Sequence, residues 1–254
     1  SSFIMVDKFK LYFDKISEYR NIHLYLPDNY FHSEQKYPVL YMLDGHNLFY
    51  DSDATYGTCL GLKDFLDAYK KKIIVVGIEG SSDDYTRVHE FVPFDIVSMQ
   101  YGPIKGRGED TFEWIIHTVK PYIDENYRTW SHREATAFAG YSMAGITSLY
   151  SILKYNDIFS KAVVISPSVM IAKDQLVKAI DESELNWDTK VFFSWGNDEY
   201  GKEMDNQIES ILYELEAHLQ KKNARTYMYK HWNGQHNEAS WRLQVPFWMN
   251  FLWF

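Results

Sequence analysis

The sequence predicts an α/β fold with a mostly parallel central sheet, covered by helices on both faces and preceded by antiparallel strands. Three observations carry this prediction. Continuous apolar runs alternate with helical segments from residue 38 onward, as they do where a parallel sheet is buried on both faces. Earlier segments instead alternate apolar and polar residues. No repeat, low-complexity tract or linker divides the 254 residues, so we expect one domain over residues 1–254.

The first elements are strands. Residues 9–13 and 21–26 alternate apolar and polar side chains, which is typical of half-buried antiparallel strands. Residues 38–43 and 73–78 are continuous apolar runs bounded by turn residues, and each predicts a strand buried on both faces. A helix is expected between them, over residues 60–71.

The second half of the chain continues this alternation. Its expected strands are 135–139, 162–165, 190–195 and 226–231, and its expected helices are 110–127, with a kink at Pro121, 143–153, 174–180 and 202–222. The loop 233–238 opens a last helix. Residues 80–108 instead predict a long irregular insertion, and loops of this length in compact domains usually serve function.

Composition excludes several classes of protein. The net charge of −9 argues against a nucleic-acid or anionic-membrane partner. Cys59 is the only cysteine, so the chain has no internal disulfide and no thiolate metal cluster. No run of about 18 apolar residues predicts a membrane span. Residues 1–5 lack the basic segment and apolar core of a signal peptide, so we expect a cytoplasmic protein.

The stretch Gly140-Tyr141-Ser142-Met143-Ala144 predicts a nucleophile elbow, a sharp turn that presents Ser142 between a strand and a helix. The turn leaves room only for the smallest residues two positions before and after the serine. Gly140 fits this pattern, whereas Ala144 replaces the usual second glycine. The alternative is that Ser142 only caps the following helix, because serine is a favoured cap.

The partners of a serine nucleophile follow at later strand ends. A serine hydroxyl needs a base to take its proton, and the base needs a carboxylate that fixes its tautomer. His236 lies in a glycine-containing loop after the last expected strand, whereas His231 lies nearer that strand and is expected to pack. Glu199 and Asp198 both follow strand 190–195. We favour Glu199 as the acid and keep Asp198 as its rival.

Backbone donors and substrate contacts are expected around Ser142. The N–H of Met143 and an N–H of the loop after strand 38–43, from His46 or its neighbours, would form an oxyanion hole. The candidate substrate-binding side chains are Asn47, Tyr141 and Arg87, the last from the 80–108 insertion. No pair of histidines has ligand spacing on one helix, so no metal is expected.

The chain also resembles the Putative esterase family of α/β-hydrolases, which includes esterase D, feruloyl esterase modules and enterobactin esterases. The matching segments are YMLDG (41–45), KPYID (120–124), YRT (127–129), AGYSMAG (139–145), ISPS (165–168) and GQHNEASW (234–241). The resemblance implies a serine esterase of the α/β-hydrolase fold without metal or organic cofactor. It carries over Ser142, His236 and an acid from the loop that begins at Gly196.

The substrate does not follow from this resemblance, because family members cleave feruloyl, acetyl, thioester and siderophore trilactone bonds. The net charge of −9 does not favour an anionic ferric siderophore. We therefore expect a small-molecule partner with a small acyl ester, such as an acetyl group on a sugar or glycan. A siderophore trilactone or feruloyl esterase and a non-catalytic binding module remain the alternatives, and the sequence leaves the oligomeric state open.

Overall fold

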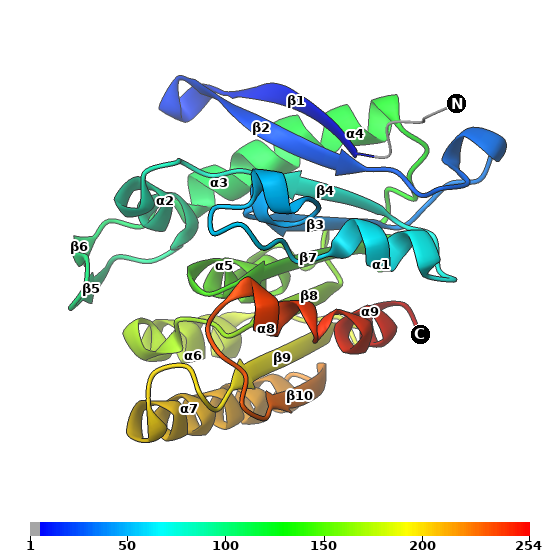
Figure 1. The fold of residues 1–254 in the computed structure, drawn as a ribbon. Helices are drawn as coiled ribbons and strands as arrows, with labels where there is room; N and C mark the ends of the chain where they lie inside the picture. Colours follow the sequence, from blue (N-terminus) through cyan, green and yellow to red (C-terminus); the bar gives the residue numbers. More distant parts are fainter. Residues whose placement is uncertain (1–5) are drawn as a thin grey trace.

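The computed structural model describes residues 6–254, so the expectation about a signal segment in residues 1–5 lies outside the described part. An eight-stranded sheet has the order β1-β2-β4-β3-β7-β8-β9-β10 (Figure 1). Its strands are β1 Val6–Phe13, β2 Glu18–Tyr25, β3 Val39–Leu43, β4 Ile74–Ile78, β7 Thr136–Tyr141, β8 Lys161–Ile165, β9 Lys190–Gly196 and β10 Arg225–His231.

The pairing directions agree with the prediction. β1 pairs antiparallel with β2, and β2 pairs antiparallel with β4. Every other neighbouring pair in this sheet, from β4 across to β10, is parallel. The central strands are wholly buried, which explains why they are continuous apolar runs rather than alternating ones.

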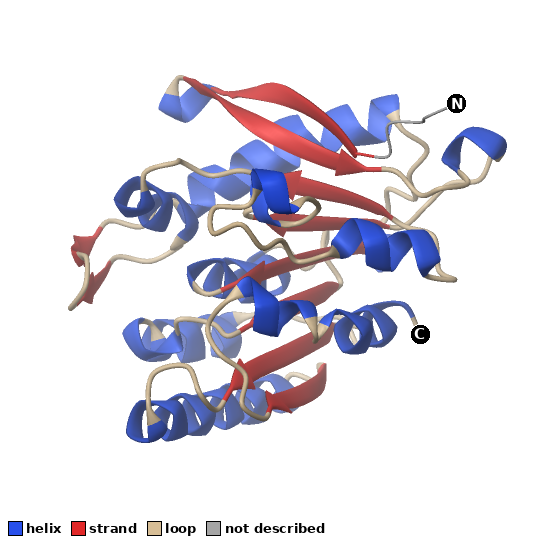
Figure 2. Cartoon of the chain, viewed as in Figure 1, coloured by secondary structure: helices blue, strands red, loops and turns tan. Residues whose placement is uncertain are grey.

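Helices cover both faces of the sheet (Figure 2). One face carries α1 Leu62–Ala68, α8 Glu238–Arg242 and α9 Val245–Trp253, and the other carries α2 Asp84–Phe91, α3 Gly108–Trp114, α4 Lys120–Asn126, α5 Met143–Lys154, α6 Lys173–Glu182 and α7 Lys202–Lys221. Successive residues of β3 alternate between the two cores: Tyr41 packs with the α5 side and Met42 with the α9 side.

The prediction of an irregular insertion over residues 80–108 is wrong. This segment forms α2 and a small hairpin of β5 Ile96–Ser98 and β6 Gly102–Ile104. Asp83 caps α2, because its carboxylate accepts the backbone N–H of Thr86 at 3.0 Å. The serine- and aspartate-rich start of the segment therefore marks a helix cap rather than a continuing loop.

The predicted kink near Pro121 takes the form of a wider helical turn. A π-helical segment, Ile115–Val119, joins α3 to α4 just before the proline. Proline has no N–H and its ring crowds the preceding turn, and π-turns are a usual way for a helix to absorb such a break. The helix also ends at Asn126, close to the predicted end.

The sheet has two functionally different edges. The parallel strands β3, β7, β8, β9 and β10 all end at one edge, where ligand sites of open α/β sheets gather. Their amino ends lie together at the opposite edge. Within residues 6–254, no helix is long and apolar enough to cross a membrane.

Candidate active site

The turn between β7 and α5 holds Ser142 in an unusual backbone conformation. Its φ of 59° and ψ of −127° are disfavoured for a residue with a side chain. The Ser142 N–H donates to the carbonyl of Ile165 at 3.0 Å. A β-carbon on Gly140 would lie 2.3 Å from the carbonyl oxygen of Ala144, so glycine is required there. Ala144 itself is buried and fits the turn.

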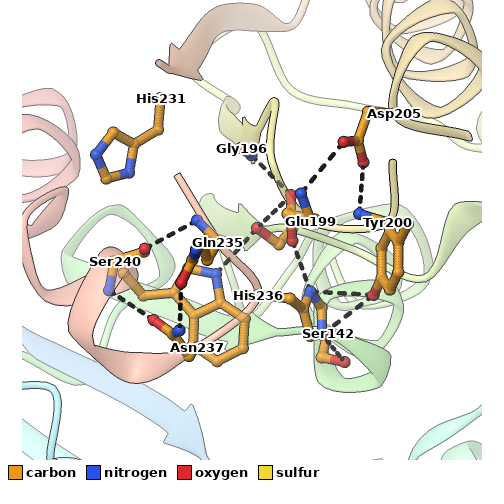
Figure 3. A network of polar contacts seen from close by, with 12 residues as sticks. Ser142, Gly196, Glu199, Tyr200, Asp205, His231, Gln235, His236, Asn237 and Ser240 are labelled. Atoms are coloured by element: carbon orange, nitrogen blue, oxygen red, sulfur yellow. Dashed lines mark hydrogen bonds and ion pairs between the residues drawn. The ribbon is translucent and has the colours of Figure 1, made fainter. Parts of the chain in front are cut away.

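The structure brings together the side chains predicted as nucleophile, base and acid (Figure 3). His236 Nε2 lies 2.9 Å from Ser142 Oγ. On the other side of the ring, His236 Nδ1 lies 2.6 Å from Glu199 Oε1. These residues come from three loops at the carboxyl edge of the sheet, after β7, β9 and β10.

The two rival acids have different surroundings. The Glu199 carboxylate is nearly buried, with 3% of its side chain exposed. Its Oε2 accepts the Gly196 N–H at 2.7 Å and the Ser166 hydroxyl at 3.2 Å. Asp198 is exposed, and its carboxylate accepts a long hydrogen bond, 3.3 Å, from the side-chain amide of Gln235. The geometry therefore places Glu199, and not Asp198, beside His236.

A second layer of side chains, which the sequence interpretation did not assign, holds the acid. The Trp241 indole N–H donates to Ser166 Oγ at 3.0 Å, so Ser166 can direct its own hydrogen at Glu199. The buried carboxylate of Asp205 accepts the backbone N–H groups of Glu199 at 3.2 Å and Tyr200 at 3.0 Å. Ser166 and Trp241 both lie in segments that match the family, and this match is the feature of the sequence that indicates them.

The Tyr200 hydroxyl lies against the histidine. It is 3.0 Å from His236 Nδ1 and 3.3 Å from Nε2 (Figure 3). Burial, together with the nearby charges of Glu199 and Asp205, raises the pKa of Tyr200. The hydroxyl thus stays protonated around neutral pH and can restrain the orientation of the ring.

His231 lies apart from this cluster, as the prediction that it packs requires (Figure 3). Its Nδ1 is 3.3 Å from the side-chain nitrogen of Gln244, and burial lowers its pKa. Among residues 6–254, no group of three or more His, Cys, Asp or Glu side chains is arranged to hold a metal ion.

The candidate oxyanion donors lie at the starts of two helical turns. Met143 is the first residue of α5, where a backbone N–H has no partner within the helix. His46 lies in the 3₁₀ turn Gly45–Asn47 directly after β3. Its side chain turns to Thr55, with Nε2 at 2.9 Å from Oγ1, and burial lowers its pKa. Their role as donors to an oxyanion stays a prediction.

The three candidate substrate contacts belong to two hydrogen-bonded groups near the site. The Asn47 side-chain amide donates to the Tyr141 hydroxyl at 3.0 Å. Arg87 makes two hydrogen bonds, 2.7 and 2.5 Å, to the buried carboxylate of Asp44. Asn47 and Tyr141 are 7% and 4% exposed, so they support the loops beside Ser142. Whether any of the three contacts substrate stays a prediction.

The chain is similar to several known proteins. YbbA of Bacillus subtilis, described as uncharacterised, is 26% identical over 211 residues, which are 82% of this chain and 76% of YbbA. Esterase Rv1288 of Mycobacterium tuberculosis is 34% identical over 141 residues, which are 56% of this chain. That match spans only 27% of the mycobacterial protein.

The fold has solved counterparts. The crystal structure of the BES protein from Bacillus cereus matches with a TM-score of 0.76 and 17% identity, over 100% of this chain and 98% of that chain. The fold is the α/β-hydrolase fold that the resemblance implies. The family model described as "Putative esterase" matches residues 14–247, so the chain belongs to the Putative esterase family.

Proposed function

We propose that the chain is a serine carboxylic-ester hydrolase that acts through an acyl-enzyme on Ser142. The observation that carries this proposal is the continuous line of contacts from Glu199 through His236 to Ser142, at 2.6 and 2.9 Å. A carboxylate, an imidazole and a hydroxyl in this order form the constellation that activates a serine for attack on a carbonyl. Family membership supports ester hydrolysis independently.

In the proposed mechanism, His236 Nε2 takes the proton of Ser142 as Oγ attacks the ester carbonyl. Glu199 stabilises the imidazolium and keeps Nδ1 protonated. The N–H groups of Met143 and His46 would bind the oxyanion, each contributing about 3 kcal/mol. The alcohol leaves with the proton from His236. Water, deprotonated by the same ring, then releases the acid and restores Ser142.

The proposed substrates are small acyl esters, such as acetyl groups on a sugar or glycan. Exposed aromatic rings lie in segments at the carboxyl edge of the sheet: Tyr85 is 51% exposed, Tyr200 46% and Trp232 68%. Flat aromatic faces of this kind can stack on a sugar ring. Arg87 is already paired with Asp44, so it offers no free charge to an anionic acyl group.

Labelling with a fluorophosphonate probe tests the mechanism. We expect one adduct, at the peptide that carries Ser142, and none in the Ser142→Ala variant. The absence of any adduct in a folded protein would instead support a non-catalytic binding module.

A panel of esters tests the substrate proposal. With p-nitrophenyl esters, kcat/KM should fall as the acyl chain lengthens beyond acetyl, and acetylated sugars should be deacetylated. Faster cleavage of feruloyl esters or of a siderophore trilactone would overturn the substrate class while leaving the acyl-enzyme mechanism intact.

A further inference from the structure

The amino-terminal edge of the sheet, opposite the candidate active site, contains a pocket of about 760 Å³. Pro38 and Ala135, just before β3 and β7, line one part of it. Lys161 and Lys190, the first residues of β8 and β9, line another part, and Trp253 closes it from the end of α9. We call this cavity the amino-edge pocket.

The strand register places like charges side by side at this edge. Lys161 is the direct partner of Lys190, and Lys190 is the direct partner of Arg225, on three neighbouring parallel strands. Paired residues project from the same face of a sheet, and adjacent strands are only about 4.8 Å apart. Like charges in such positions destabilise a sheet. The register thus concentrates three cations at this edge, where Lys190 and Arg225 lie over the ring of Phe251.

The amines of Lys161 and Lys190 donate hydrogen bonds to neutral acceptors. Lys161 Nζ donates to the backbone carbonyl of Glu134 and, at 2.9 Å, to Ser160 Oγ. Lys190 Nζ donates to the carbonyl of Phe251 at 3.1 Å. These bonds fix the amines in place without neutralising their charge.

More lysines line the same pocket: Lys36, Lys70, Lys71 and Lys72. Within the described residues, Lys72 is the one lysine of the pocket with a carboxylate partner, Asp28 at 3.1 Å. One acid, Glu134, also lines the pocket; it and Asp188 contact Arg133 at 3.5 and 2.7 Å and also act on the Lys161 amine. The pocket is thus strongly positive in a chain whose net charge is −9.

Two further features of the pocket favour an anionic ligand. The indole N–H of Trp253 is buried without a hydrogen-bond partner among residues 6–254. Burial, followed by the charge of Lys190, lowers the pKa of Lys161 to about 8. A bound anion would stabilise the protonated form of these amines.

We propose that the amino-edge pocket binds a small polyanion that carries phosphate or carboxylate groups. The in-register cations Lys161 and Lys190 supply two charges fixed by hydrogen bonds, and Lys70 and Lys71 supply two more. Lysine amines are compact charges with three donors each, and they are common ligands of phosphate. The candidate active site lies at the opposite edge of the sheet, so binding in the amino-edge pocket does not depend on the proposed function.

Isothermal titration of the full chain with sodium tripolyphosphate tests the proposal. We expect one saturable site whose dissociation constant rises at least about tenfold in Lys161→Gln and in Lys190→Gln. Lys178→Gln, which removes an exposed amine on α6 with 76% of its side chain exposed, is the matched control and should bind as the original chain does. Ser142→Ala should also bind unchanged.

A parallel titration with citrate distinguishes the two ligand chemistries: tighter tripolyphosphate binding assigns phosphate, and tighter citrate binding assigns carboxylate. Lys71→Gln, which changes another lysine of the pocket lining, keeps the test decisive if Lys161→Gln does not fold, because it should weaken binding severalfold. The proposal is overturned if neither anion binds saturably at about 50 mM salt, where surface charges are only partly screened. It is equally overturned if the pocket variants and Lys178→Gln weaken binding alike.

Discussion

At the scale of single residues, the site depends on a few backbone positions that the sequence identifies well. Small residues around Ser142 predict the elbow, and the structure shows why, since Gly140 faces the Ala144 carbonyl. His236 follows from its place after the last strand. The choice between Glu199 and Asp198 needs the fold, because Glu199 is selected by contacts with Gly196 and the distant Ser166.

The two rival acids can be separated by isosteric substitutions. Glu199→Gln should lower kcat on p-nitrophenyl acetate by about 10³–10⁴-fold, because an amide cannot stabilise the imidazolium and favours the wrong tautomer. Asp198→Asn, the matched control, should stay within about twofold of the original rate, since its carboxylate is exposed. The reverse ranking of the two variants would assign the acid to Asp198.

The elbow makes a prediction about stability. Gly140→Ala should destabilise the chain by about 1–3 kcal/mol, because its methyl group would meet backbone atoms of Ala144 that cannot move away. Urea unfolding measures this change. Ala144→Gly removes a methyl group from the same turn without adding a clash, so its loss should be smaller. Equal or greater loss in Ala144→Gly would argue against this account of the turn.

At the scale of elements, the loop between β9 and α7 positions the acid. Asp205, in the first turn of α7, accepts the N–H groups of both Glu199 and Tyr200, which ties the loop to the helix. The sequence predicts α7 and β9 but not this tie, which joins two elements through one side chain. The sequence also does not predict helix α2. Its N-cap, Asp83, is a residue type that is equally common in loops, and only the structure shows that a helical turn follows it.

This tie can be tested with Asp205→Asn. One side-chain oxygen becomes an NH₂ donor that faces a backbone N–H, so the loop should loosen and kcat should fall about tenfold while KM changes less. The apparent pKa of the acidic limb of kcat/KM should also move, because Glu199 would hold His236 less firmly. A merely structural role for Asp205 would leave that pKa in place.

The matched control is Glu203→Gln, which alters an exposed acid in the same turn of α7. It should leave kcat and the pH profile unchanged. If Glu203→Gln reproduced the effects of Asp205→Asn, the loss of negative charge at the start of α7 would explain them, and the hydrogen bonds of Asp205 to the loop would not.

At the scale of the whole molecule, the sheet separates two charged sites. The sequence predicts the strands, their mostly parallel order and the gathering of Ser142, Glu199 and His236 at one edge, because strand ends can be read from apolar runs. The cationic row at the other edge cannot be read in this way. It depends on register, which brings Lys161, Lys190 and Arg225 together although they are far apart in the chain.

The row also makes the stability of the molecule depend on pH. The pKa of Lys161 is about 8 in the folded chain and 10.5 normally, so the folded state binds fewer protons than the unfolded state between these values. Stability should therefore rise with pH in this window. Burial is the main cause of this lowered pKa, and the charges of Lys190, Asp188, Arg133 and Glu134, which face the amine, adjust it.

In Lys161→Met this contribution is absent. From about pH 8 upward, the free energy of unfolding of the original chain should rise relative to that of the variant by about 1 kcal/mol per pH unit. Urea unfolding of both proteins at several pH values measures the difference, which cancels the titration of all other groups. A constant difference between the two proteins would contradict the assigned pKa.

The central claim is that Ser142 forms an acyl-enzyme, and a stopped-flow burst assay with p-nitrophenyl acetate tests it most directly. We expect a burst of about one equivalent of p-nitrophenol per chain, followed by slower turnover, because acylation of an activated ester precedes slower deacylation. Ser142→Ala should show neither phase. A burst of the same size in that variant would place the nucleophile elsewhere, and a folded original chain with no hydrolysis would contradict the esterase proposal.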